Sequence, residues 1–243
     1  MSRCTALLPA LAALLLTTTG CALVDEALDD PKPPPAVSAS PAVDEGALDG
    51  SADGLPLADA IAQLVVEPEH TGGYQRDSFR HWTGGDDPDD GCDTRGELLL
   101  AEAVKPPTKE AGCTLVGGEW FSYYDEVTVT DASKLDVDHM IPLEEAWSSG
   151  AHAWDAERRT AFANDLAAPR SLVAVTAKTN RSKGARDVAE WLPPAESALC
   201  TYLEDWTTTK LRWELTADET EHAALERLAP QCPDSTVTVI PAP

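Results

Sequence analysis

The alternation of hydrophobic and polar residues at 135–139 predicts a short, half-buried β-strand, in which apolar residues flank Asp136 and Asp138. A second apolar run, rich in β-branched residues, spans 172–176. It passes directly into a polar, helix-compatible segment at 177–184. The pattern therefore predicts a strand, a second strand and a helix, with polar side chains where the first strand ends.

Other segments predict a mixed α+β fold around this unit. Residues 117–130 combine β-formers with turn residues and predict a hairpin, which we expect beside the strand at 135–139. A capping box at Thr216 predicts the start of the last helix. The tail at 237–240 reads as a weak strand or a frayed end. Apolar residues recur at helical spacing at 55–66 and 195–213, and further helices are expected at 96–104 and 216–228.

The first 21 residues have the pattern of an export signal, with one cation and an apolar run too short to span a bilayer. Small residues and Gly20 precede Cys21, which favours lipoprotein cleavage and a lipid on that cysteine. Ordinary cleavage and release is the alternative. The protein is expected outside the cell or at its surface, with Cys21 as its one membrane attachment.

Composition divides the rest of the chain into a linker and one domain. Residues 22–60 are acidic, rich in proline and poor in large apolar residues, so they predict a disordered linker. Residues 61–243 have the length and the aromatic content of a single domain with a sizeable core.

Four cysteines lie in this domain, and an even number in an exported chain predicts disulfides. Three pairings are possible, and we favour the one between neighbours, Cys92 with Cys113 and Cys200 with Cys232. No Cys-x-x-Cys spacing is present for a structural zinc site.

Two side chains at the end of the first predicted strand, and one on the predicted helix, suggest chemistry. Asp138 and Asn180 offer hard oxygen ligands, which suit Mg²⁺ first and Mn²⁺ or Ca²⁺ as alternatives. His139 would then be free to act as a general base, and Lys183 or Arg181 would contact a phosphate. An ordinary hydrogen-bonded Asp-His pair and a plain helix end are the structural alternatives for each half taken alone.

The motifs Asp-x-Asp-His-x-x-Pro-Leu at 136–143 and Asn-Arg-x-Lys-Gly at 180–184 together resemble the ββα-metal, or HNH, nucleases in their Asp-His and Asn form. More loosely, residues 70–232 are similar to secreted bacterial HNH proteins with two disulfides. Two departures stand out. The middle asparagine of the family, which braces the histidine loop, is replaced by Ser171 or Asn164. The gap after His139 is longer than in compact members of the family, which implies an inserted helix at 155–166.

The resemblance also suggests supporting residues. Asp136 and Glu145 could support the metal from a second layer, although a surface position is the plainer reading for Glu145. Arg76 and Arg95 could reach a phosphate, and Arg95 lies in a Cys-Asp-Thr-Arg segment that recurs in the family. A surface salt bridge or a helix cap explains these arginines equally well.

Charge is the main argument against a nucleic-acid enzyme. The chain carries a net charge of −24, and residues 61–243 have 16 basic against 33 acidic residues, a net charge of −17. Such a bulk charge repels a polyanion. A nuclease needs only a local cationic groove, and basic residues do gather in and around the motifs, at Arg158, Arg159, Arg170, Lys178, Arg181, Lys183 and Arg186.

The sequence thus predicts an exported, metal-dependent endonuclease acting on DNA, with RNA as a further substrate and no evident obligate protein partner. Two other classes of protein fit the same residues. A catalytically silent binding or scaffold domain would keep the fold and the disulfides without turnover. A metal-dependent phosphoesterase for small molecules would need an enclosed pocket.

Overall fold

The computed structural model describes residues 54–243 of the chain. The predicted signal peptide (1–21) with Cys21, and most of the predicted linker (22–60), lie outside the described residues. The folded part begins before the expected residue 61, because the first strand precedes it and pairs with the end of the chain. No helix within the described residues is long and apolar enough to cross a membrane.

Within residues 54–243 the strands form four antiparallel pairs. The predicted hairpin, the two central strands and a short strand in the tail are all present. The pairs are β1 (Leu55–Pro56) with β8 (Thr236–Val237), β2 (Thr108–Glu110) with β3 (Thr114–Val116), β4 (Trp120–Ser122) with β5 (Val127–Val129), and β6 (Leu135–His139) with β7 (Leu172–Thr176).

Helices occupy the segments where the sequence predicts them, and a short helix also follows Pro142. The last one is capped by Asp218, whose carboxylate accepts from two backbone N–H groups, and not by the expected Thr216. The α-helices are α1 (Leu57–Ile61), α2 (Thr94–Ala101), α3 (Leu143–Ser148), α4 (Ala156–Ala163), α5 (Ala177–Lys183), α6 (Leu199–Arg212) and α7 (Glu219–Leu228). Short 3₁₀ helices are η1 (Arg76–Ser78), η2 (Ala111–Cys113), η3 (Ala132–Lys134), η4 (Ala151–Ala153), η5 (Glu196–Ala198) and η6 (Ala229–Gln231).

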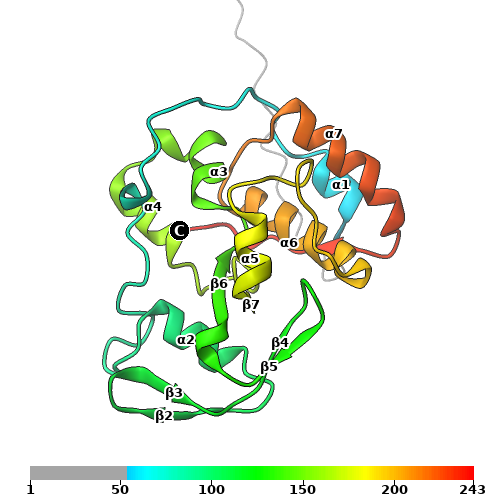
Figure 1. Cartoon of the computed structure of the whole chain (residues 1–243). Helices are drawn as coiled ribbons and strands as arrows, with labels where there is room; N and C mark the ends of the chain where they lie inside the picture. The colour runs from blue at the N-terminus through cyan, green and yellow to red at the C-terminus, as the bar shows by residue number, and fades with distance from the viewer. Residues whose placement is uncertain (1–53) are drawn as a thin grey trace, which may run out of the picture. The chain divides into compact units, whose positions relative to one another are not determined.

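The β6–β7 pair lies between two hydrophobic cores. Its register sets Asp136 opposite Val175 and Asp138 opposite Val173, so these side chains share one face. That face meets the larger core, to which α1, α3, α6 and α7 contribute. The other face, with Leu172, meets a smaller core under α2 and β4. In Figure 1, α1, α6 and α7 lie together on one side of β6 and β7, and α2 lies on the other.

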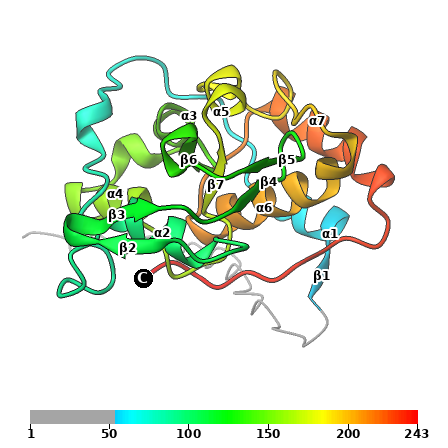
Figure 2. The same cartoon turned by 60° about the horizontal axis from the view of Figure 1, so that its bottom comes forward.

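The β4–β5 hairpin lies beside the β6–β7 pair, as expected, with its closest contacts to β7. Trp120 and Val129 of the hairpin share the smaller core with Leu135 and Val137 of β6. The backbone N–H of Thr176 donates to the Ser122 hydroxyl at 3.0 Å. Figure 2 shows the hairpin alongside β7 and above α6. The neighbour of a hairpin is chosen by side-chain packing in the assembled fold, which the local pattern does not report.

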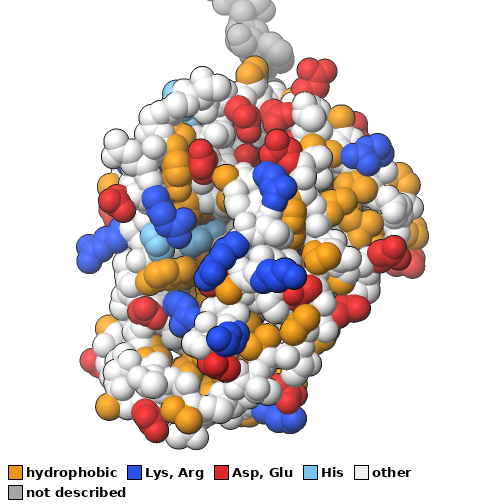
Figure 3. All heavy atoms as spheres, in the orientation of Figure 1, with side chains coloured by type: hydrophobic (Ala, Val, Ile, Leu, Met, Phe, Trp, Pro, Cys, Tyr) orange, Lys and Arg blue, Asp and Glu red, His pale blue; other side chains and the backbone are white. Residues whose placement is uncertain are grey.

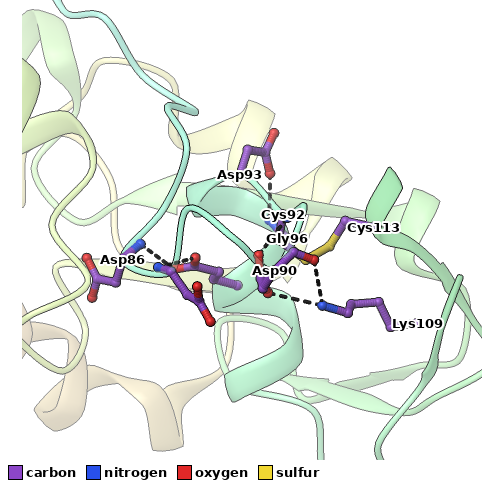
Figure 4. The surroundings of a disulfide bond; sticks show 9 residues. Asp86, Asp90, Cys92, Asp93, Gly96, Lys109 and Cys113 are labelled. Atoms are coloured by element: carbon purple, nitrogen blue, oxygen red, sulfur yellow. Dashed lines mark hydrogen bonds and ion pairs between the residues drawn. A yellow bond between two sulfur atoms is a disulfide. The ribbon is translucent and has the colours of Figure 1, made fainter. Parts of the chain in front are cut away.

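Both predicted disulfides are confirmed, Cys92–Cys113 and Cys200–Cys232. The first joins the start of α2 to η2, and Figure 4 shows it beside the Asp90 carboxylate, which Lys109 contacts at 3.2 Å. The second joins the start of α6 to the chain after α7. Each bridge therefore fastens a helix whose packing borders one of the two cores.

Candidate active site

Helix α5 is fixed at its first turn by the turn that joins β4 to β5. The Asp125 carboxylate accepts hydroxyl hydrogen bonds from Thr176 and Thr179, at 2.5 and 2.6 Å. Burial would raise the pKa of Asp125, but these bonds and one from Ser122 outweigh it and lower the pKa. This anchored start places Asn180, the residue after Thr179, against Asp136 of β6.

Asp138 is buried on the β6 face that meets α5. One of its oxygens, Oδ2, accepts from the Tyr124 hydroxyl at 2.7 Å and from the Lys183 ammonium at 2.5 Å. The other oxygen, Oδ1, has no protein partner within residues 54–243. Burial raises the pKa of Asp138, although the Lys183 charge opposes that rise. The carboxylate is therefore held rigidly while one oxygen stays available.

Lys183 cannot make the phosphate contact that the sequence suggested, because its side chain is 0% exposed. Its ammonium donates to Asp138 and to the carbonyl oxygens of His139 and Met140, at 3.0 and 2.8 Å. An ammonium has three N–H donors, so all of them are used. Although burial lowers the pKa of Lys183, three acceptors favour the charged form, and the residue acts as an internal counterion to Asp138.

Asp136, Asn180 and Arg181 meet at the open side of the same face. The Asn180 amide Nδ2 lies 3.5 Å from an Asp136 oxygen, and the Arg181 guanidinium lies 3.4 Å from the same oxygen. The Arg181 side chain is 75% exposed, so this ion pair is weak and easily exchanged. Arg181 is thus free to swing toward a phosphate, which Lys183 is not.

His139 ends β6 and is almost completely buried. Its Nε2 lies 2.9 Å from the Ala163 carbonyl oxygen at the end of α4. A carbonyl can only accept, so Nε2 carries the proton and the other ring nitrogen, Nδ1, holds a lone pair. Burial lowers the pKa of His139 to about 3, so the ring is neutral at physiological pH. In this tautomer Nδ1 is unprotonated and can accept a proton, as a general base must.

The His139 ring is held between two aromatic rings. Trp82 stacks on it with centroids 5.3 Å apart, and Phe162 lies near parallel to it at 6.4 Å. Neither contact was anticipated from the sequence, because Trp82 lies more than fifty residues from His139 in a loop with no regular pattern. The same holds for Tyr124, whose hydroxyl fixes Asp138.

Asn164 braces the segments around this histidine. Its Oδ1 accepts from the Thr83 N–H and the Thr94 hydroxyl, and its Nδ2 donates to the Arg80 carbonyl. It directly follows Ala163, whose carbonyl holds the ring. Ser171, the other candidate for the middle asparagine of the family, contributes a backbone carbonyl to Met140 N–H. Among the described residues, Asn164 therefore has the side-chain bonds suited to that bracing role.

A cavity of about 350 Å³ opens over these groups. Its walls come from β6, α5 and the chain on either side of them, and they carry two arginines and Tyr74. Figure 3 shows Lys and Arg side chains gathered around the histidines on this face of an otherwise acidic protein. Lining residues with polar side chains are Tyr74, Arg76, Asp138, His139, Glu144, Asn180 and Arg181.

Two of the expected supporting residues lie elsewhere. Glu145 is neither at the cavity nor at the surface, because it is buried and pairs with Lys210 at 2.8 Å. Arg95 donates to the carbonyl oxygens of Ala132 and Leu135, at 3.2 and 3.1 Å, and lines a different cavity. Both corrections come from tertiary packing, which the local sequence does not report; Glu144, the neighbour of Glu145, does line the cavity.

The oxygen donors at the cavity are suited to a hard divalent cation. Asp138 Oδ1 is unpaired within the described residues, and the Asn180 amide lines the same cavity. No group of three or more His, Cys, Asp or Glu side chains in residues 54–243 is arranged to hold a metal. Mg²⁺ accepts such a sparse set, because it keeps several waters and binds substrate phosphates alongside one or two carboxylates. The residues therefore fit the expected ion.

A neutral histidine lies beside a carboxylate and an amide, on a strand–strand–helix unit with arginines around it, which is the arrangement that the sequence predicts for a nuclease. The chain belongs to the family described as GmrSD restriction endonucleases, C-terminal domain, whose model matches residues 102–228. This range includes all three residues of the cavity centre, Asp138, His139 and Asn180.

A second comparison extends the match beyond that domain. The chain is 37% identical over 173 residues to an uncharacterized secreted protein of Arthroderma benhamiae, over 71% of this chain and 82% of that protein. No solved structure matches the chain significantly. The family membership supports a nucleic acid as the substrate and hydrolysis as the reaction.

Proposed function

We propose that this protein is an HNH-type, metal-dependent endonuclease that hydrolyses phosphodiester bonds of DNA, with RNA as a further substrate. The observation that carries the proposal is the orientation of His139. Its protonated Nε2 is fixed by the Ala163 carbonyl, while its unprotonated Nδ1 belongs to a ring that lines the cavity with Asp138 and Asn180. A base and two oxygen ligands thus converge on one space.

In this mechanism His139 Nδ1 takes a proton from the water that attacks phosphorus. The oxygen of that water forms a bond to phosphorus as the bond to the departing sugar oxygen breaks, and the sugar oxygen is protonated from solvent. The stacked Trp82 and Phe162 rings keep the base from rotating. The resulting imidazolium returns its proton to solvent after the product leaves.

Asp138 and Asn180 are the proposed metal ligands, with Asp136 supporting them through Asn180. The ion, Mg²⁺ in first place and Mn²⁺ or Ca²⁺ as alternatives, supplies stabilisation of negative charge on the reacting phosphate when it is bound. Arg181 and Arg76 line the same cavity and hold the phosphate by charge-assisted hydrogen bonds.

The proposal includes export. The secreted name of the Arthroderma benhamiae relative and the two disulfides of this chain support a location outside the cell. A lipid at Cys21 remains part of the proposal, and that residue lies outside the described part of the chain.

The test is plasmid cleavage by purified residues 54–243 with Mg²⁺, Mn²⁺, Ca²⁺ or EDTA. We expect turnover with a divalent ion and none in EDTA. His139→Ala should lower turnover by roughly two to four orders of magnitude, the usual contribution of a positioned base, while metal affinity is kept. His222→Ala is the matched control, because that histidine lies on α7 and bonds the Ile61 carbonyl away from the cavity.

Two results would redirect the proposal. Turnover of a small phosphodiester with no cleavage of plasmid would indicate a phosphoesterase for small molecules. No metal-dependent turnover of either substrate would indicate a silent binding domain. Asp138→Asn and Asn180→Ala should weaken Mn²⁺ binding measured by calorimetry, and unchanged binding in both variants would remove them as ligands.

A further inference from the structure

A second cavity, of about 670 Å³, lies next to the proposed active site. Trp82 lines it and also stacks on His139, so this ring separates the two cavities. Its floor is formed by the start of α2, the Cys92–Cys113 disulfide and η3. The volume is within the range that binds small organic ligands, and a nucleotide is of that size.

Two arginines give this cavity a positive wall. Arg80 is exposed and its guanidinium has no partner within the described residues. Arg95 uses its Nη2 on two backbone carbonyls, which fixes the guanidinium and leaves its Nε and Nη1 donors without protein partners there. Asp93 is the one carboxylate in the lining, and its Oδ1 is already used by the Gly96 N–H. The lining charge therefore favours an anion.

The aromatic wall is built at a cost in backbone conformation. Trp82 has a φ of 56°, in the left-handed region that residues with large side chains rarely adopt. Hydrogen bonds on both sides hold it there, from Asn164 to the carbonyl of Arg80 and from the Thr83 N–H to Asn164. Such strain persists only where surrounding contacts enforce it, and it clusters at functional sites.

The two cavities follow the same strand. Arg95 bonds the carbonyl of Leu135 at the start of β6, and His139 ends that strand. Four residues of extended chain span about 13 Å, so one nucleic-acid strand can occupy both cavities.

We propose that the second cavity binds one unpaired nucleotide of the substrate strand, next to the phosphate that is cut. The inference rests on the proposed nuclease function and adds to it a preference for single-stranded or locally opened nucleic acid. Arg80 and Arg95 hold a phosphate, and the base stacks against the exposed part of Trp82, as aromatic platforms do in single-strand binding.

The test separates binding from cleavage. Affinity for a labelled single-stranded oligonucleotide of about 12 nucleotides is measured by fluorescence anisotropy in EDTA, where no turnover occurs. Arg80→Ala should weaken binding roughly fivefold to tenfold. It should also reduce the slope of log affinity against log salt concentration by about one. Arg227→Ala, which removes the same charge from an exposed site on α7, is the control and should have no comparable effect.

A second variant fills the cavity without removing charge. Gly84 lines it, has an ordinary backbone conformation, and has no atom within 4 Å of where a Cβ would stand. Gly84→Phe should therefore fold normally and weaken oligonucleotide binding by about as much as Arg80→Ala does. It should also lower the rate of oligonucleotide cleavage relative to that of a small phosphodiester.

The outcomes distinguish this inference from the proposed function. If Arg80→Ala and Gly84→Phe both bind the oligonucleotide as tightly as Arg227→Ala does while the protein still cleaves DNA, the proposed nucleotide subsite is wrong and the proposed nuclease function is kept. If the protein cleaves no phosphodiester but the two variants lose affinity, the subsite stands and the nuclease is wrong. If the unaltered protein bound duplex and single-stranded oligonucleotides with equal affinity, the proposed preference for an unpaired nucleotide would be wrong.

Discussion

At the scale of single residues, the buried charge of Lys183 organises the centre of the site. The ammonium compensates Asp138 and also binds the backbone carbonyls of His139, the last residue of β6, and of Met140, which follows it. It therefore sets both the charge and the shape of the surface on which we propose that the metal binds.

Replacing Lys183 with Met should lower the free energy of unfolding by about 3–5 kcal/mol, because it leaves Asp138 buried without its counterion. Lys178→Met on the same helix is the control, since that side chain is exposed and its loss should change stability by less than about 0.5 kcal/mol. Urea unfolding measures both. Adding Asp138→Asn to Lys183→Met should recover part of the loss, and no recovery would contradict the pairing as its cause.

The sequence predicted that Asp138, His139 and Asn180 lie close together because the strand–strand–helix pattern that carries them is local, and all three line one cavity. It assigned Lys183 to the phosphate because the residue lies one turn after Asn180, where a helix pattern sets both on one face. Which part of that face is covered depends on Tyr124 and α6, which come from distant segments. For the same reason, the hydrogen bond between His139 and the Ala163 carbonyl, which fixes the tautomer of the ring, could not be predicted from the sequence.

At the scale of elements, the two disulfides do different work. Cys200–Cys232 fastens α6 and α7, which bury the larger core, and it lines neither of the two cavities around His139. Cys92–Cys113 lines the proposed nucleotide cavity. Stability and substrate binding can therefore be separated by removing one bridge at a time.

Converting Cys200 and Cys232 to Ser should lower the free energy of unfolding by about 2–4 kcal/mol, because the bridge closes a loop of 32 residues. Turnover per folded molecule should be retained. Converting Cys92 and Cys113 to Ser should in addition weaken oligonucleotide binding. Denaturant unfolding and anisotropy measure the two effects, and equal binding losses in both variants would contradict the division.

Helices and hairpins were foreseeable where one periodicity runs uninterrupted, as in α6 and β4–β5. The order of the elements in space was not. The hairpin joined β7 because Ser122 caps the backbone of Thr176, a bond between residues more than fifty positions apart. Neighbouring cysteines paired as favoured, since short loops cost the least entropy to close.

At the scale of the whole molecule, a negative bulk charge surrounds a small positive face. Two salt effects then oppose each other, because ions screen the long-range repulsion of DNA and also weaken short-range arginine contacts.

Cleavage of long DNA should therefore pass through an optimum at moderate ionic strength. Arg181→Ala should lower cleavage of long DNA more than that of a small phosphodiester, since Arg181 lies exposed at the cavity edge. Initial rates over a salt series measure both. A steady decline from the lowest salt upward would mean that the acidic surface does not impede the substrate.

The buried acids should make stability depend on pH. Burial on α6 raises the pKa of Asp205 to about 7, although the Arg170 charge opposes the rise. The folded state then binds more protons than the unfolded state between about pH 4 and 7, so its contribution to stability falls as pH rises through that window. A shift of this size corresponds to about 4 kcal/mol at most.

Urea unfolding at about pH 5 and pH 8 should show this fall, and Asp205→Asn should reduce it. Glu157→Gln is the control, since that acid is exposed on α4. An equal fall in all three proteins would assign the effect to other acids, such as the buried Glu221, whose pKa burial also raises to about 7.

The pairing of β1 with β8 offers a site by which the protein can be immobilised on a solid support. The strand that opens the folded region is fastened to the tail and to α1, and none of its residues lines the two cavities around His139. A solid support attached to the chain ahead of Leu55 would thus hold the protein by a strand pair that lines neither cavity. Beads carrying the protein by that end should digest DNA at a rate per molecule close to that of the free enzyme.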